Sequence, residues 1–251
     1  MYFNFTENKI MLLEIAVSNI EAALLAESAG ADRIELCDNL AEGGTTPSFG
    51  YLQYAITTIK IPVFPIIRPR GGNFNYTTAE FETMLLDIAV CKQLGYKGIV
   101  TGILLPNGNV DVVRTKLLVA AAAPMQVTFH RAYDRTNNAQ TALEAVIETG
   151  CNRILTSGLY TNVNAGLATL VALVQQAGNR IIIMPGSGVR STNLEQLIVA
   201  TKATEYHSSA AVAQQNNMEF KNENFEITDG IYNTVATTEI EKQKAILVKH
   251  K

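Results

Sequence analysis

The sequence predicts a single (β/α)8 barrel of the TIM type, an α/β fold, and three observations lead to this class. The chain has 251 residues, close to the roughly 250 residues of a typical barrel of this kind. Its residues are 47% hydrophobic and 17% charged, as expected for parallel strands covered by helices. One unit also recurs: a short apolar strand-like run, a polar or glycine-containing loop, and a segment of helical period.

Eight short segments have the β-branched, apolar composition of strands. In chain order they are residues 12–18, 33–38, 62–69, 98–104, 126–132, 153–158, 180–186 and 205–210. The segments between them have helical periodicity, and a final helix is expected near the C-terminus. These helical segments are residues 20–29, 79–94, 112–122, 141–148, 165–176, 194–201 and 234–248. Glycines follow several of them, as expected at a C′ position: Gly30, Gly95, Gly150 and Gly178.

Eight strands that alternate with helices favour right-handed crossovers, a parallel sheet and closure into a barrel. A doubly wound open sheet is the alternative, and it is weakened because no GxGxxG motif follows the first strand. No internal linker interrupts the pattern. We therefore expect one domain over residues 1–251, with residues 1–10 as a flexible extension.

Composition and termini argue against several classes of protein. The net charge is −3 without a basic cluster, which argues against a nucleic-acid partner. No apolar run approaches the roughly 18 residues of a membrane span. The start "MYFNFTENKI" lacks the features of a signal peptide, so we expect a cytoplasmic protein. The three cysteines have no CxxC spacing, which argues against a disulfide framework or a zinc site.

Several predicted strands alternate between apolar and polar residues, although buried parallel strands are usually apolar throughout. Alternation places the polar side chains inside the barrel, and most of them fall near the carboxyl ends of strands, where barrel enzymes build their sites. Buried charges must pair with one another, with water or with a ligand. The candidate catalytic residues are Glu14, Glu35, Arg68, His130 and His207. The alternative is a self-satisfied polar core.

Loops at the same end of the barrel carry anion-binding signals. Arg68 and Arg70 lie in "IIRPRGGNFNYT", and guanidinium groups bind carboxylate or phosphate in a bidentate fork. For Arg68, an ion pair with Glu14 or Glu35 is an equal alternative. The loops after strands seven and eight often bind phosphate in barrels. The candidates there are the amides of Gly186, Ser187 and Gly188, in "MPGSGV", together with Ser208.

Two further stretches bear on the mouth of the barrel. In "LAEGGTTPSFG" (40–50), Glu42, Gly43 and Gly44 are expected to cover a pocket, and Pro47 near Ser48 is expected to start a helix. In "VTFHRAYD" (127–134), His130 is expected to point inward, whereas Arg131 and Asp134 are expected to pair at the rim.

Together these stretches resemble the copper homeostasis protein CutC family. The resemblance rests on "GADRIELCDNLAEGGTTPSFG", "IPVFPIIRPRGGNFNY", "VTFHRAYD", "RILTSG", "MPGSGV" and "HSSA". It implies a (β/α)8 barrel, a cytoplasmic homo-oligomer and a role in copper handling. Members of the family often carry cysteines in the first strand and in the loop that resembles "GGNFNY". Here those positions hold Ala16 or Val17, and Asn75.

The copper site implied by the resemblance therefore depends on Cys37, with His130 or His207 as a second ligand. Cu(I) prefers thiolate ligands, with imidazole next. The alternative for Cys37 is a small buried hydrophobic side chain. Three functions remain open. The first is a copper-binding protein of copper homeostasis, and the second is a barrel enzyme or binder for a small anionic ligand, phosphorylated ligands included. A non-catalytic scaffold is the third.

Overall fold

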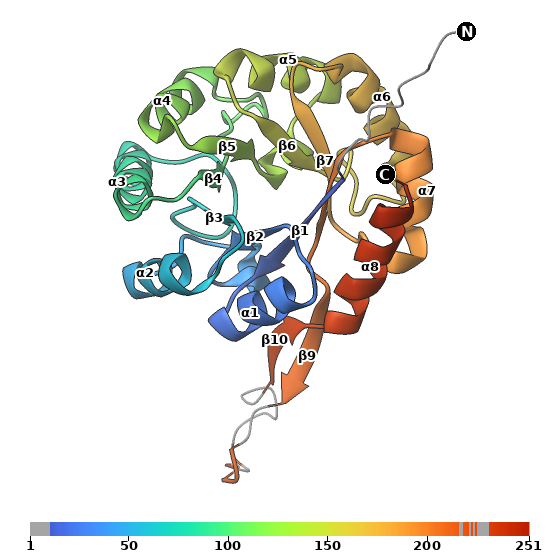
Figure 1. Ribbon diagram of the computed structural model, residues 1–251. Coiled ribbons are helices and arrows are strands. Elements are labelled where there is room, and N and C mark those ends of the chain that lie inside the picture. The colour runs from blue at the N-terminus through green and yellow to red at the C-terminus, as the bar shows by residue number, and fades with distance from the viewer. Residues whose placement is uncertain (1–10, 216–217, 221, 223, 225–230, 251) are drawn as a thin grey trace, which may run out of the picture.

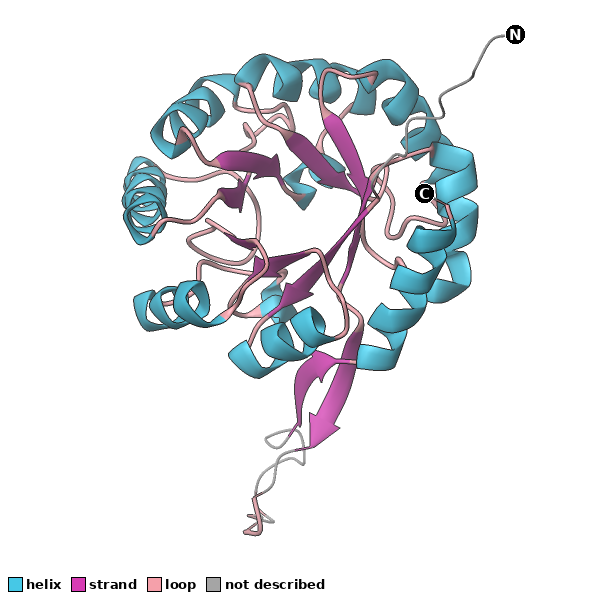
Figure 2. Ribbon diagram, in the orientation of Figure 1, coloured by secondary structure: helices cyan, strands magenta, loops and turns pink. Residues whose placement is uncertain are grey.

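The computed structural model describes residues 11–215, 218–220, 222, 224 and 231–250. Residues 1–10, where the sequence predicts a flexible extension, lie outside the described residues. Eight short strands surround a common axis and helices form a ring outside them (Figure 2). The strands are β1 Leu12–Val17, β2 Arg33–Leu36, β3 Val63–Pro65, β4 Gly98–Thr101, β5 Gln126–Phe129, β6 Arg153–Thr156, β7 Ile182–Pro185 and β8 Glu205–Ser208.

The helices alternate with the strands, as predicted. They are α1 Ile20–Ser28, α2 Phe49–Thr58, α3 Thr78–Leu94, α4 Val112–Ala122, α5 Ala139–Thr149, α6 Leu167–Ala177, α7 Ser191–Thr201 and α8 Thr237–Lys249. Two short 3₁₀ helices, Leu40–Glu42 and Arg131–Arg135, lie after β2 and β5. Every strand is shorter than its predicted segment. Most lose their carboxyl end, because the chain there turns into the loops of the barrel mouth.

Parallel pairing connects the strands in two runs, β3-β2-β1-β8 and β4-β5-β6-β7. An isolated parallel bridge between Ile66 and Val100 joins the two runs on one side, and the Ile67 amide donates to the Val100 carbonyl over 2.7 Å. On the other side β7 lies against β8. The (β/α)8 fold class predicted from the sequence is confirmed.

Local sequence explains the helix ends that position the loops. The Thr77 hydroxyl accepts from the Glu80 amide and the Glu80 carboxylate accepts from the Thr77 amide, which forms a capping box at the start of α3. Gly95 ends that helix at φ +87°, a left-handed value that glycine adopts without strain. Helix α2 begins directly after Pro47 and Ser48, where the sequence predicts a helix start, and the Ser48 hydroxyl caps it by accepting from the Tyr51 amide.

The main hydrophobic core lies between the strands and the helices. Outward-facing strand residues such as Ile15, Ile34 and Phe129 are fully buried in it. A second, smaller apolar cluster consists of the inward-facing Cys37, Phe64, Ile66 and Val100. The alternation seen in the sequence therefore separates an apolar outer face from a mixed inner face.

A hairpin of β9 Ala211–Gln215 and β10 Ile231–Val235 was not expected from the sequence. It is antiparallel, pairs Ala211 with Val235, and projects away from the barrel (Figure 1). The Asn19 side chain donates to the Asn233 carbonyl over 2.9 Å and so fastens the hairpin to the start of α1. In the described part of the chain, no helix has the length and apolar character needed to cross a membrane.

Candidate active site at the barrel mouth

A network of alternating charges fills the lower part of the barrel interior, which is the part near the amino ends of the strands, opposite the mouth. Arg33 donates to Glu14 and, over 2.5 Å, to Glu205. Arg153 donates to the same Glu205 carboxylate over 3.0 Å. All four side chains are buried, and each charge meets one of opposite sign, as burial requires. We call Glu14, Arg33, Arg153 and Glu205 the lower layer.

The ring of Phe64 completes the lower layer. The Arg33 and Arg153 guanidinium carbons lie 4.9 Å and 5.3 Å from its centroid, distances at which a cation is attracted to the ring face. The ring occupies the space above Gly98, where an added Cβ would lie only 2.3 Å from the ring. Gly98 is therefore needed for the packing of the interior.

His207 connects the lower layer to the residues above it. Its Nδ1 lies 2.8 Å from Glu14 Oε1, and its Nε2 lies 3.6 Å from Glu35 Oε2. Burial opposes the charged imidazole, but the Glu14 hydrogen bond and the Glu35 and Glu14 charges outweigh it, so the His207 pKa is raised. Burial would also raise the pKa of Glu14, yet Arg33 and His207 lower it to about 2. Glu14 is therefore ionised and His207 Nδ1 is the donor.

Glu35 is buried like Glu14, but among the described residues no arginine or lysine forms an ion pair with it. Burial raises its pKa to about 7, because the favourable charge of His207 is opposed by the nearby charge of Glu14. The carboxyl is thus divided between its two protonation states near neutral pH. Facing the Nε2 atom of His207, it forms a pair that can share and pass a proton.

His130 lies across the mouth from this pair with one nitrogen unused. Its Nδ1 accepts from the Ala132 amide over 3.2 Å, which places the ring proton on Nε2. That buried Nε2 has no hydrogen-bond partner among the described residues. Burial and the charge of Arg68 lower the pKa of His130 to about 3, so the ring is a neutral donor. We call Glu35, His207 and His130 the mouth site.

A pocket of about 280 Å³ joins the three residues of the mouth site. Phe74, Arg131, Ser187 and Gly188 also line it. The ring of Phe74 packs against the His130 imidazole, with a centroid separation of 4.9 Å. At about 30 Å³ per water molecule, the volume corresponds to roughly nine water molecules, so the pocket accommodates only a small ligand.

The two arginines proposed for anion binding have structural roles instead. The Arg68 guanidinium donates to the carbonyls of Glu42, Gly44 and Gly72, over 2.6–2.9 Å, and so holds the mouth loops together. It pairs with neither Glu14 nor Glu35. Arg70 forms an ion pair with Glu80 on the outside, at 2.5 Å. Neither arginine is among the residues that line the pocket.

The proposed phosphate loop is also largely occupied by its own structure. The Gly186 amide donates to the Thr156 carbonyl over 2.9 Å, so it cannot serve a three-amide anion nest. The buried Ser208 hydroxyl donates to the Val189 carbonyl over 3.1 Å and accepts from Gln243. Ser187 and Gly188 do line the pocket, at φ +77° and +81°. The loop therefore shapes the pocket without forming the expected anion site.

The residues present do not fit Cu(I). Cys37 is buried beneath the loop of residues 40–44, and its sulfur would lie 3.2 Å from a Cβ at Gly44. Burial raises the pKa of its thiol well above the usual range, which disfavours the thiolate that Cu(I) requires. Cys37 is not among the pocket-lining residues, so the site proposed from Cys37 and a histidine is not assembled.

One other group of ligand atoms lies close together among the described residues. Oxygen and nitrogen atoms of Glu14, Glu35 and His207 fall within 4.8 Å of one another. Glu14 already gives one oxygen to Arg33 and the other to His207. This leaves one imidazole nitrogen and one carboxyl facing the pocket, a set better suited to proton transfer than to enclosing a soft metal ion.

Sequence reasoning placed Glu14, Glu35, His130 and His207 inside the barrel, where the structure brings them together. It did not identify Arg33 as the partner that neutralises Glu14, or Glu205 and Arg153 as the rest of the charge network. All three occupy inward positions of alternating strands. The predicted rim pair is confirmed, since Arg131 Nε lies 2.8 Å from Asp134 Oδ2. Sequence reasoning did not place Arg131 at the pocket.

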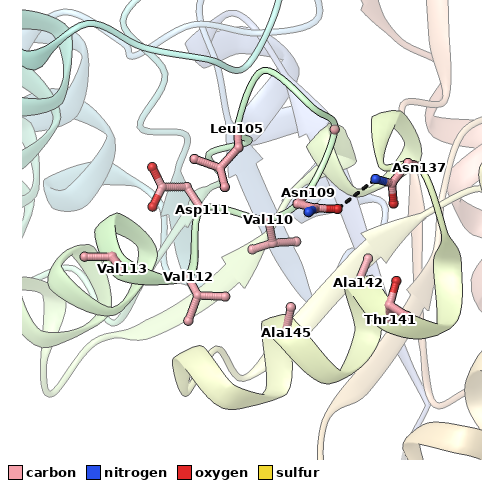
Figure 3. A pocket seen from close by; sticks show the side chains of 11 residues that line it. Leu105, Asn109, Val110, Asp111, Val112, Val113, Asn137, Thr141, Ala142 and Ala145 are labelled. Atoms are coloured by element: carbon pink, nitrogen blue, oxygen red, sulfur yellow. Dashed lines mark hydrogen bonds between the residues drawn. The ribbon is translucent and has the colours of Figure 1, made fainter.

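A larger pocket of about 480 Å³ lies away from the mouth site, between the loop before α4 and helix α5 (Figure 3). Asn109 and Asn137 hydrogen-bond to each other over 2.7 Å at its edge. Asp111 is its one titratable side chain among the described residues, and it accepts from the Arg114 amide to cap α4. We assign no chemistry to this pocket, because its polar groups are already paired.

Comparisons with known proteins agree with the fold. The CutC family model matches residues 11–212. A CutC family protein of Chromobacterium violaceum is 48% identical over 199 residues, covering 79% of this chain and 81% of the relative. The human copper homeostasis protein cutC homolog is 44% identical over 211 residues, covering 84% and 77%.

Solved structures of a CutC protein and of another barrel protein are also similar to this chain. CutC from Streptococcus agalactiae has a TM-score of 0.75 at 33% identity, covering 80% of this chain and 99% of that one. Phosphoribosylanthranilate isomerase from Thermotoga maritima has a TM-score of 0.58 at 12% identity, covering 96% and 100%, a likeness of fold alone. The match of the family model over most of the chain, with these relatives, shows that the chain belongs to the CutC family.

Proposed function

We propose that this protein acts in copper homeostasis and that it does so through a small-molecule site at the barrel mouth. The process is taken from the relatives, which include a human copper homeostasis protein cutC homolog. The site is taken from one observation: Glu35 and His207 face a pocket of about 280 Å³ with an incompletely neutralised carboxyl. The protein is a binder or an enzyme for a small anionic ligand rather than a carrier of Cu(I).

The choice against a Cu(I) carrier follows from the position of the thiol. Cys37 is 1% exposed and packs with Phe64, Ile66 and Val100. A ligand for Cu(I) must present sulfur to the ion, and a protonated thiol beneath a closed loop does not. On this account Cys37 is a packing residue.

Complementation of copper tolerance tests the proposal. A copper-sensitive bacterial strain without its own family member would receive the wild-type chain, Glu35→Gln or Cys37→Ala. We expect the wild type and Cys37→Ala to restore growth on copper, and Glu35→Gln to fail. Glu82→Gln, which removes an exposed carboxylate, is the matched control and should complement. Complementation by Glu35→Gln together with failure of a folded Cys37→Ala would overturn the proposal.

A Cu(I) titration against a chromophoric chelator checks the same choice in vitro. The wild type and Cys37→Ala should compete equally for the ion. A clear loss of affinity in Cys37→Ala would restore Cys37 as a copper ligand.

We further propose a cytoplasmic location and a homo-oligomer. The three cysteines are free, as expected in a reducing compartment. The adjacent helices α3 and α4 expose Leu86, Val113 and Leu117, and these large apolar side chains on neighbouring helices support the proposal of a contact surface there. Cell fractionation tests the location, and recovery of the protein outside the cytoplasm would refute it. Light scattering coupled to gel filtration tests the assembly, and a strict monomer would refute the homo-oligomer.

A further inference from the structure

Within the part of the chain that the structure describes, the buried Nε2–H group of His130 lacks a hydrogen-bond partner. An unpaired buried donor destabilises the folded protein, so such a group is usually paired with another atom of the protein, with water or with a ligand. Its tautomer is fixed by the Ala132 amide at Nδ1, and its ring is held by Phe74. An oxygen atom of a ligand in the pocket would complete this hydrogen bond. Because the donor is neutral, it suits a carbonyl oxygen that gains negative charge during a reaction.

The second component is the Glu35–His207 pair on the same pocket. Glu35 has no arginine or lysine bonded to it among the described residues, in contrast to Glu14. A carboxyl whose pKa is near 7 is suited to take a proton and to return it at neutral pH. A neutral imidazole donor combined with a carboxylate base is a known solution for abstracting a proton next to a carbonyl group.

The third component is a cation at the rim. Arg131 is the one arginine or lysine among the described residues that line the pocket. Its Nε donates to Asp134 over 2.8 Å and one terminal nitrogen donates to Ser157 over 3.2 Å. Its other terminal nitrogen has no hydrogen-bond partner among the described residues, and the side chain is 40% exposed. It is therefore placed to bind a carboxylate of the ligand.

From these three components, we propose that the mouth site catalyses proton exchange at the carbon next to the carbonyl group of a small 2-oxo acid. Glu35 removes the proton: the C–H bond breaks, its electron pair forms a C=C bond, and the carbonyl π pair moves to oxygen. The enolate oxygen accepts the hydrogen bond from His130 Nε2–H. The reverse step returns a proton from Glu35 to carbon, so the balance requires no oxidant and no further reactant.

This inference rests on the proposed function only in using the same pocket, and it adds the substrate class and the reaction. His207 acts as a positioning residue. Fixed by Glu14 at Nδ1, it presents Nε2 to Glu35 and passes the proton between Glu35 and solvent. The small volume of the pocket excludes large substrates.

Deuterium incorporation tests the proposal directly. The full-length protein, with a metal chelator present, is incubated with pyruvate in D2O, and loss of the methyl signal is followed by proton NMR. Hydroxyacetone, which has the carbonyl group without the carboxylate, is the parallel probe. We expect exchange above the buffer rate with pyruvate and at least tenfold slower exchange with hydroxyacetone.

Variants identify the groups responsible. Glu35→Gln should lower the enzymatic exchange rate at least about 100-fold, because it removes the base. His130→Phe should lower it about 10- to 100-fold, because it removes one donor to the enolate. Glu82→Gln, at an exposed position, should exchange like the wild type. Circular dichroism melts establish that each variant is folded.

Several outcomes would overturn the proposal: no exchange above buffer with either probe, exchange that persists in folded Glu35→Gln, or exchange that appears only in a parallel sample without the chelator. Exchange confined to hydroxyacetone would refute the 2-oxo acid as the substrate class. These results are independent of the copper-tolerance assay. A chain without exchange whose copper tolerance still depends on Glu35 would refute the reaction and leave the proposed function intact.

Discussion

Glu14 and Glu35 lie on adjacent strands, point into the same barrel and are both buried, yet their surroundings differ. Glu14, in the lower layer, accepts from Arg33 and His207. Glu35, in the mouth site, has His207 Nε2 at 3.6 Å as its nearest cation partner. The Glu14 carboxyl has a pKa of about 2 and is ionised, whereas the Glu35 carboxyl has a pKa of about 7 and is only partly ionised at neutral pH. The number of charged partners, rather than burial itself, therefore separates a carboxyl that stays ionised from one whose pKa lies near 7 in this interior.

The largest expected effect is on the lower layer. Arg33→Met removes the cation shared by Glu14 and Glu205 and leaves buried carboxylates with too few partners. We expect a loss of about 3–5 kcal/mol in the free energy of unfolding, measured by urea denaturation. Arg180→Met is the control: its pair with Glu144 is exposed and screened by water, so its loss should change the stability far less. Equal effects of the two substitutions would show that the buried charge network contributes no more to stability than an exposed ion pair does.

An intermediate effect is expected at Glu35, and it depends on pH. The folded-state pKa of about 7 exceeds the ordinary 4.5, so the folded chain binds more protons than the unfolded chain between these values. Stability therefore falls as pH rises through this window. The pKa of Glu35 is set by burial and by the charged and titratable groups that face its carboxyl, which are His207, Glu14, Cys37 and Arg33.

Glu35→Gln removes that penalty. The variant should be more stable than the wild type at pH 8, by about 1–3 kcal/mol, and equal to it at pH 4. Urea denaturation at both pH values measures the difference. A variant that is less stable at pH 8 would mean that the Glu35 carboxylate is well paired in the native state.

The smallest effect on stability is expected at His130. His130→Phe removes an unpaired Nε2–H group and adds apolar contact with Phe74, but it leaves the Ala132 amide without its acceptor. These contributions oppose each other, so thermal denaturation should show a change within about 1 kcal/mol. A large destabilisation would show that the ring holds the mouth together instead of serving a ligand.

The sequence was sufficient for the fold because the strand and helix periods are local. Alternation also placed Glu14, Glu35, His130 and His207 inside the barrel. It could not decide the partners, since these depend on the register: Glu14 lies opposite Arg33 on one side and His207 on the other. For Arg68, the sequence left an ion pair with a buried glutamate and the binding of an anionic ligand as equal alternatives. Its actual acceptors are backbone carbonyls of two loops, and the periodicity of the sequence does not predict the path of a loop.

The most direct test of the central comparison is a carbon-13 NMR titration of the glutamate carboxyl signals, with Glu14 and Glu35 assigned by substitution. We expect two separate transitions, at about pH 2 for Glu14 and about pH 7 for Glu35. Titration of both carboxyls near the ordinary value of 4.5 would contradict the division of the barrel interior into a paired lower layer and a poised mouth site.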